Sequence, residues 1–177
     1  DEYWGEPAHI EDVTLKVIAD GDSIVMNLQG GSIDMMARIT TTQAAQLGDQ
    51  FDILEGTMNL VQAMYLNNAV EPFNNEKVRQ ALSYAINKQE IMDFMADGKG
   101  TPIASSMFPA FGKYYMEELN NVYTTDTEKA KELLAEAGYP DGFTFTIKVP
   151  SNYQPHIDTA TVLAEQLKAI GVTANIE

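Results

Sequence analysis

The stretch EPFNNEKVRQALSYAINKQEIMDFMADGKGTP, residues 71–102, decides the fold class because it predicts two consecutive helices. Its apolar residues recur at the 3.6-residue period of amphipathic helices, and Asn75 stands where an N-cap belongs. Asn87 begins the second helix, with Glu90 three residues on as a capping-box partner, and Gly98 ends it. These stripes predict that both helices pack on a hydrophobic core. The stripe of the first helix consists of Val78, Ala81, Leu82, Ala85 and Ile86, and the stripe of the second consists of Ile91, Phe94 and Met95.

The composition indicates a folded acidic domain. The 177 residues suffice for one hydrophobic core, and 26 Asp and Glu against 11 Lys and Arg give a formal net charge of -15. Nucleic acids and anionic membranes need clustered Lys and Arg, so the charge argues against both partners. The absence of cysteine excludes disulfides, thiol nucleophiles and zinc–thiolate sites. We expect a single domain over residues 1–177, cut from within a longer sequence.

Two apolar patterns flank a short helix near the N-terminus. Val13–Ile18 and Ile33–Ile39 are predicted as strands, and Asp20 caps the helix between them, which Gly30 and Gly31 end. This order predicts a βαβ unit and hence a parallel sheet. The following predicted elements are a helix over Thr40–Leu47 and strands over Phe51–Glu55 and Leu60–Leu66.

The C-terminal third predicts a second βαβ unit. A long loop over Thr101–Thr125 precedes a helix with Asp126 as N-cap and Gly138 at its end. Phe143–Val149 alternates as a strand should, a helix closed by Gly171 follows, and Val172–Ile176 begins another strand. The fold class is therefore α/β, with βαβ units, a mixed and mainly parallel sheet, and a sheet incomplete at the C-terminus.

No constellation of residues supports catalysis. The only histidines, His9 and His156, lack a second histidine at metal-ligand spacing, and Ser105-Ser106 lacks a nucleophile-elbow context. The glycines of residues 97–101 follow a helix rather than a strand and do not form a phosphate loop. The sequence predicts no enzyme, no metal and no cofactor.

Several long segments, in order, carry a family resemblance. They resemble the bacterial extracellular solute-binding proteins of family 5, which are the dipeptide, oligopeptide and nickel receptors of ABC importers. The opening DEYWGEPAHIEDVTLKVIAD and the later GGSIDMM are similar as well. The three main segments are EPFNNEKVRQALSYAINKQEI (71–91), TDTEKAKELLAEAGYPDGFTFTIKVPSN (125–152) and HIDTATVLAEQLKAIGVTANIE (156–177).

The resemblance implies most of the second lobe of a two-lobed receptor with a periplasmic-binding-protein type II-like fold. The first lobe would lie on the N-terminal side. Further helix and strand beyond Glu177 would carry the acidic residue that holds a peptide's amino terminus in peptide-binding members. It also implies export to the periplasm or the outer face of a bacterial cell, with ABC permease subunits as partners. Lobe closure provides much of the affinity, so we expect the isolated chain to bind weakly.

Loops at the carboxyl ends of parallel strands are the physical default for a ligand site. They point to Asn152, Tyr153 and His156 after one predicted strand, and to Tyr65, Asn67 and Asn68 after another. The resemblance implies that His156 lies near the carboxylate of a bound peptide. The alternative is that His156 merely decorates an exposed helix start.

The loop after the helix pair provides further candidates. Ser105, Ser106 and Met107 resemble a pocket-lining segment of the family, and the alternative is that this loop packs against the first lobe. Arg79 is expected to form an intramolecular ion pair rather than a ligand contact. The predicted function is peptide capture for import. Nickel chelates or other small solutes are the alternative within the family, and a sensor or chaperone-like binding protein is the alternative outside transport.

Overall fold

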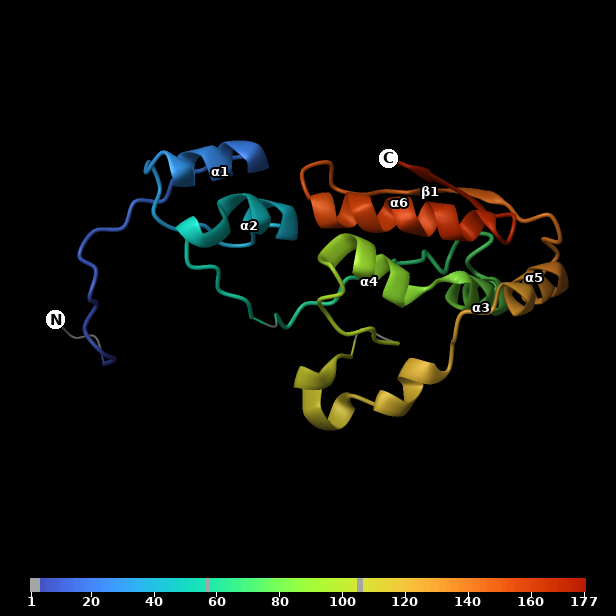
Figure 1. Ribbon diagram of the computed structural model, residues 1–177. Helices are drawn as coiled ribbons and strands as arrows, with labels where there is room; N and C mark the ends of the chain where they lie inside the picture. The colour runs from blue at the N-terminus through green and yellow to red at the C-terminus, as the bar shows by residue number, and fades with distance from the viewer. Residues whose placement is uncertain (1–3, 57, 105–106) are drawn as a thin grey trace. The chain divides into compact units, whose positions relative to one another are not determined.

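The computed structural model describes residues 4–56, 58–104 and 107–177 (Figure 1). The chain divides into two compact units, residues 1–54 and 55–177. Each unit has its own cluster of buried apolar side chains. The expectation of a single domain over residues 1–177 stays a prediction.

The first unit contains two short helices, α1 (Gly21–Gln29) and α2 (Thr41–Leu47), followed by the 3-10 turn η1 (Gly48–Gln50). Both predicted helices are confirmed with their caps. The carboxylate of Asp20 accepts the Ser23 N–H at 2.7 Å, and hydrogen bonding with the side chain and then the backbone of Ser23 lowers the pKa of Asp20. The helices enclose a small core made of Ile24, Val25, Leu28 and Leu47.

The strands predicted in residues 13–55 are wrong, and with them the first βαβ unit. The described part of the chain has no strand there, and Val17 is 99% exposed. An apolar alternation forms a strand only when a neighbouring strand takes up its backbone groups, and none is present among the described residues. Arg38 adds a local interruption, because its φ of 62° is left-handed. The mispredicted strands are Val13–Ile18, Ile33–Ile39 and Phe51–Glu55.

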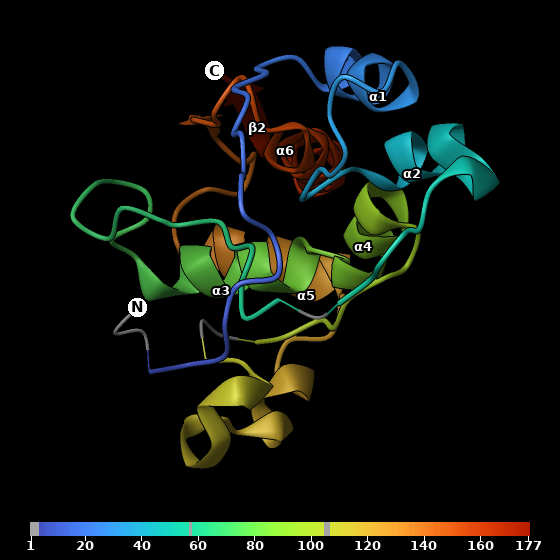
Figure 2. The ribbon, with the colours of Figure 1, turned by 90° about the vertical axis from the view of Figure 1, so that its left-hand side faces the viewer.

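The second unit contains the helix pair and the second βαβ unit at the predicted places (Figures 1 and 2). The predicted burial of the second stripe is wrong, because α4 has no fully buried residue and its Phe94 is 63% exposed. The loop over Thr101–Thr125 includes two 3-10 segments, and Leu60–Leu66, expected as a strand, is an extended segment without a partner strand among the described residues. The elements are α3 (Glu76–Ala85), α4 (Lys88–Ala96), η2 (Pro109–Tyr114), η3 (Glu117–Asn121), α5 (Thr127–Glu136), β1 (Thr144–Ile147), α6 (Gln154–Lys168) and β2 (Thr173–Ile176).

β1 and β2 form a parallel pair with Phe145 opposite Ala174. α6 connects the two strands, and the loops that enter them touch at a pair of glycines. Gly142 has a φ of 78°, and a Cβ there would lie 2.0 Å from the backbone oxygen of Gly171. Only glycine fits this close approach, because a side chain would collide with backbone on the facing loop.

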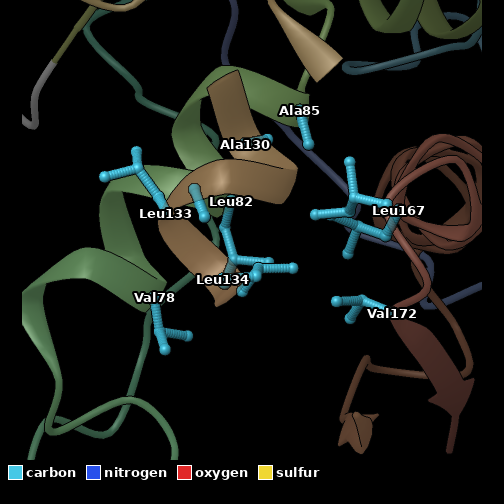
Figure 3. Packing of buried hydrophobic residues seen from close by; sticks show 10 residues of the cluster. Val78, Leu82, Ala85, Ala130, Leu133, Leu134, Leu167 and Val172 are labelled. Atoms are coloured by element: carbon cyan, nitrogen blue, oxygen red, sulfur yellow. The ribbon is translucent and has the colours of Figure 1, made fainter. Parts of the chain in front are cut away.

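The core of the second unit lies between the α3–α5 helix pair and the α6–β2 segment. Figure 3 shows Leu82 and Leu134 on one side facing Leu167 and Val172 on the other. All four side chains are at most 1% exposed. The apolar stripe that predicted α3 is thus the buried face of that helix.

The junction between α3 and α4 differs from the predicted capping box. Asn87 caps α4 by accepting the Glu90 N–H at 3.2 Å, as predicted. The Asn87 N–H, however, is donated to the side-chain oxygen of Gln166 at 3.1 Å rather than to Glu90. The amide nitrogen of Gln166 donates in turn to the Asn87 carbonyl oxygen at 3.2 Å and to the Glu90 carboxylate at 2.8 Å. One glutamine of α6 therefore fixes the start of α4.

Candidate functional site

The start of α6 follows the loop of residues 148–153, which leaves the carboxyl end of β1, and carries two of the predicted site residues. The rings of Tyr153 and His156 meet edge to face, with centroids 4.4 Å apart. The backbone explains the contact, because the His156 N–H donates to the Tyr153 carbonyl oxygen at 3.1 Å. Tyr153 is 37% exposed, so a ligand can reach the pair. Asn152, the third predicted residue, is exposed one position earlier.

Two other segments brace this turn through residues that sequence reasoning missed. The side chain of Gln62 donates to the Pro155 carbonyl oxygen at 3.1 Å and to the Thr159 hydroxyl. That hydroxyl lies 3.2 Å from the sulfur of Met95 in α4. The sequence signal that could have indicated this contact is Gln62 itself, because it carries the one amide side chain in the apolar run 60–66. The start of α6 is therefore held from two sides.

Tyr65 and Asn67 lie on the segment that Gln62 anchors. Tyr65 is 84% exposed, while its neighbours Met64 and Leu66 pack against the main core. The side-chain oxygen of Asn67 accepts the Ala69 N–H at 3.1 Å and so holds a turn, with Asn68 exposed beside it. Among the described residues, no hydrogen bond or ring contact links Tyr65 or Asn67 to the Tyr153–His156 pair.

The loop after α4 is held by hydrogen bonds at the end closest to that helix. Lys88 donates to the Ile103 carbonyl oxygen at 3.0 Å, and burial lowers the pKa of this lysine. The Asn120 side chain accepts the Ala104 N–H at 3.0 Å and donates to the Tyr115 hydroxyl at 2.7 Å. Met107, a predicted site residue, is 44% exposed. The other two, Ser105 and Ser106, lie outside the described residues.

Arg79 does not form the expected ion pair within the described part of the chain. Its guanidinium donates to the Phe73 carbonyl oxygen at 2.8 Å, across the loop that precedes α3. Arg79 therefore has a structural role at the start of α3.

The α6 site combines an imidazole, an aromatic edge and a helix N-terminus. The positive end of the helix dipole favours a negatively charged or carbonyl group, although Pro155 has no backbone N–H and the His156 N–H is already donated to Tyr153. The residues that the structure describes contain no group of three or more His, Asp or Glu placed to hold a metal ion. In the same residues, no helix is long and apolar enough to cross a membrane. The geometry suits reversible binding of a polar solute.

Comparison with known families gives one match over the whole chain. The family model described as "Bacterial extracellular solute-binding proteins, family 5 Middle" matches residues 1–177.

Two curated relatives show the range of solutes among similar proteins. The chain is 31% identical over 180 residues to heme-binding protein A of Haemophilus influenzae, covering 98% of this chain and 32% of that protein. It is 33% identical over 180 residues to the glutathione-binding protein GsiB of Salmonella typhimurium, covering 98% of this chain and 34% of that protein. The chain thus spans about a third of the length of these relatives.

Solved structures match the fold. The periplasmic binding protein DppA from Helicobacter pylori, in complex with the peptide STSA, has a TM-score of 0.78 at 28% identity, covering 99% of this chain and 34% of that one. NikZ from Campylobacter jejuni, in complex with Ni(L-His), also has a TM-score of 0.78, covering 92% of this chain and 35% of that one. At 24% identity, this second likeness shows the fold alone. The predicted α/β fold of a periplasmic binding protein is confirmed.

Proposed function

The chain belongs to the bacterial extracellular solute-binding proteins of family 5, and from that premise we propose that it forms most of one lobe of an ABC importer's substrate-binding component. The ligand is captured between this lobe and another part of the same polypeptide. The observation that carries the proposal is the Tyr153–His156 pair at the start of α6. It stands at the carboxyl end of a parallel strand, where α/β proteins place their ligands.

Peptides are the solute class that we propose. The likeness to a peptide complex extends over 99% of the chain, and glutathione, named for another relative, is itself a tripeptide. A peptide offers a terminal carboxylate, which suits the imidazole of His156 and the helix N-terminus. Asn152 and Asn67 add amide groups that match a peptide backbone, and Tyr65, Ser105, Ser106 and Met107 complete the proposed lining.

A smaller non-peptide solute is the second candidate. The relative named for heme favours it, because that protein is 31% identical to this chain over 180 residues. A third possibility keeps the binding site but replaces transport by sensing or a chaperone-like role. A permease gene beside the coding sequence would favour import, and a kinase gene there would favour sensing.

The remaining parts of the proposal concern partners and location. We propose an exported protein without enzymatic activity, which docks on a membrane permease after the two lobes close around the ligand. Closure buries the ligand and provides much of the affinity. Residues 1–177 alone are therefore expected to bind peptides more weakly than millimolar.

Native mass spectrometry of the full-length polypeptide, purified without denaturation from rich medium, tests the solute class. A ladder of co-purified masses that fit short peptides is the expected result. A single metal-chelate mass would overturn the peptide assignment in favour of the second candidate. A protein that is empty, and stays empty after incubation with a peptide digest, would contradict peptide capture and favour the sensor alternative.

A further inference from the structure

A groove with an apolar floor runs between α4 and α6, within the second unit and away from the first turn of α6. Its volume is about 520 Å³, and its lining comes from these two helices alone. Phe94 of α4 is 63% exposed there, and Val162 of α6 lies half-buried opposite it. A large aromatic side chain this open to solvent, beside a second apolar residue, marks a surface that a partner can cover. The lining residues are Glu90, Phe94, Thr161, Val162, Glu165 and Gln166.

The rim of the groove is acidic and carries no lysine or arginine among its lining residues. Glu90 and Glu165 stand on opposite helices. Helical spacing adds Asp93 on the α4 side and Asp158 on the α6 side, three or four residues from the lining positions. Each carboxylate keeps capacity for another donor, since a carboxylate has about four acceptor positions. Among the described residues, each of these four carboxylates accepts from one other side chain. The donors are Gln166 for Glu90, Lys168 for Glu165, Gln89 for Asp93 and Gln154 for Asp158.

The lysines that flank α4 do not neutralise this rim, because both are engaged elsewhere. Lys88 donates to the Ile103 carbonyl oxygen, and Lys99 pairs with Glu55. Lys168 is the nearest base on α6, and it pairs with Glu165 at 2.5 Å. Lys168 thus neutralises Glu165 locally, whereas Glu90, Asp93 and Asp158 have no ion pair among the described residues, so the field over the groove is negative in a chain whose net charge is already -15.

We propose that the α4–α6 groove docks a basic amphipathic helix of a partner protein. An apolar face with leucine-like side chains would cover Phe94 and Val162, and flanking lysine or arginine side chains would pair with Glu90 and Glu165. A helix laid in a groove between two helices is a common recognition mode, and opposite charges at the rim set its orientation and its rate of association. This site is separate from the solute site, and the proposal stands whichever solute the protein carries.

The test uses a fluorescent, helix-forming peptide of lysine and leucine, blocked at both ends so that it offers no free terminus to the solute site. The expected result is saturable binding to the full-length polypeptide that weakens steeply with salt. F94A is expected to weaken it about tenfold, because exposed aromatic anchors dominate such interfaces. F111A, which removes another exposed aromatic ring, serves as the matched control and should leave it unchanged. The double variant E90Q/E165Q should flatten the salt dependence.

Each other outcome overturns the proposal. Equal binding by wild type and F94A would show that the peptide lies elsewhere. If H156A weakens it instead, the peptide occupies the solute site, and the proposed function gains support while the groove loses it. Binding that ignores salt, or equal binding of a peptide with glutamate in place of lysine, would remove the charge complementarity on which the basic partner rests. No binding at low salt would contradict the proposal outright.

Discussion

Replacing Gln166 by alanine should weaken the contact between α4 and α6 by a predictable amount. The side chain makes three hydrogen bonds, two with the backbone of Asn87 and one with the carboxylate of Glu90. Bonds between neutral groups contribute about 1 kcal/mol each, and the third lies at the exposed surface and adds little. We expect Q166A to lower the free energy of unfolding by about 2 kcal/mol. Urea denaturation followed by circular dichroism measures this change.

The matched control is Q80A, which removes the same kind of side chain from α3, where it bonds only the exposed Glu76 at 3.2 Å. Its effect should stay within about 0.5 kcal/mol, as for other surface substitutions. In Q166A, Glu90 is free to take the vacated Asn87 N–H and complete the capping box. E90A should therefore cost more in the Q166A background than in wild type. The reasoning is refuted if Q166A is no more destabilising than Q80A.

Three shorter predictions concern other parts of the chain. G142A should lower the free energy of unfolding by more than about 3 kcal/mol, because its Cβ would lie 2.0 Å from backbone, whereas G112A, with φ +55° and open space around its Cβ, should cost about 1–3 kcal/mol from backbone strain alone. Thermal unfolding of both variants separates the clash from the backbone strain. Lys77 donates to Glu136 at 2.9 Å and holds the pKa of that carboxyl below its ordinary 4.5. The pair therefore adds stability at neutral pH that is lost as the pH falls through the lowered pKa. On acidification, K77M should lose less stability than the wild type. Denaturation of both proteins at several pH values measures the difference. Amides of residues 13–18 should exchange rapidly with solvent in residues 1–177, because no strand among the described residues pairs with them, and strong protection in a hydrogen-exchange measurement would contradict this.

The helices could be predicted because their signals are local. Asp20, Asn75, Asn87 and Asp126 each cap the helix they were expected to cap. A cap and a 3.6-residue stripe act within one segment, so a single sequence contains all the information they need. The second βαβ unit followed for the same reason, because glycines and alternation bracket its elements.

The strands that the sequence predicts within residues 13–66 are absent from the described residues, because a strand depends on its neighbour. Val17 alternates as a strand residue should and is nevertheless 99% exposed among the described residues. Alternation reports which faces a segment could bury, and says nothing about whether a partner strand is present. The same holds for the Gln166 bridge, where a residue 79 positions away takes the hydrogen bond that local rules assign to Glu90.

The candidate site was predictable in part. Tyr153 and His156 follow from the rule that ligands lie beyond the carboxyl ends of parallel strands, and the structure brings their rings together. Gln62 and Thr159, which brace the same turn, join segments 97 positions apart. Contacts at that separation depend on the packing of the whole unit, so no pattern along the chain identifies them in advance.

The most direct test of the proposed solute site compares bound ligand in three variants of the full-length polypeptide by native mass spectrometry. Y153A and H156A each remove one ring of the pair at the start of α6, and Y114A removes a 64% exposed tyrosine of η2 as a control. We predict that co-purified peptide masses are lost or strongly reduced in the first two variants and retained in the third. Full peptide occupancy in both Y153A and H156A would contradict the assignment of this site.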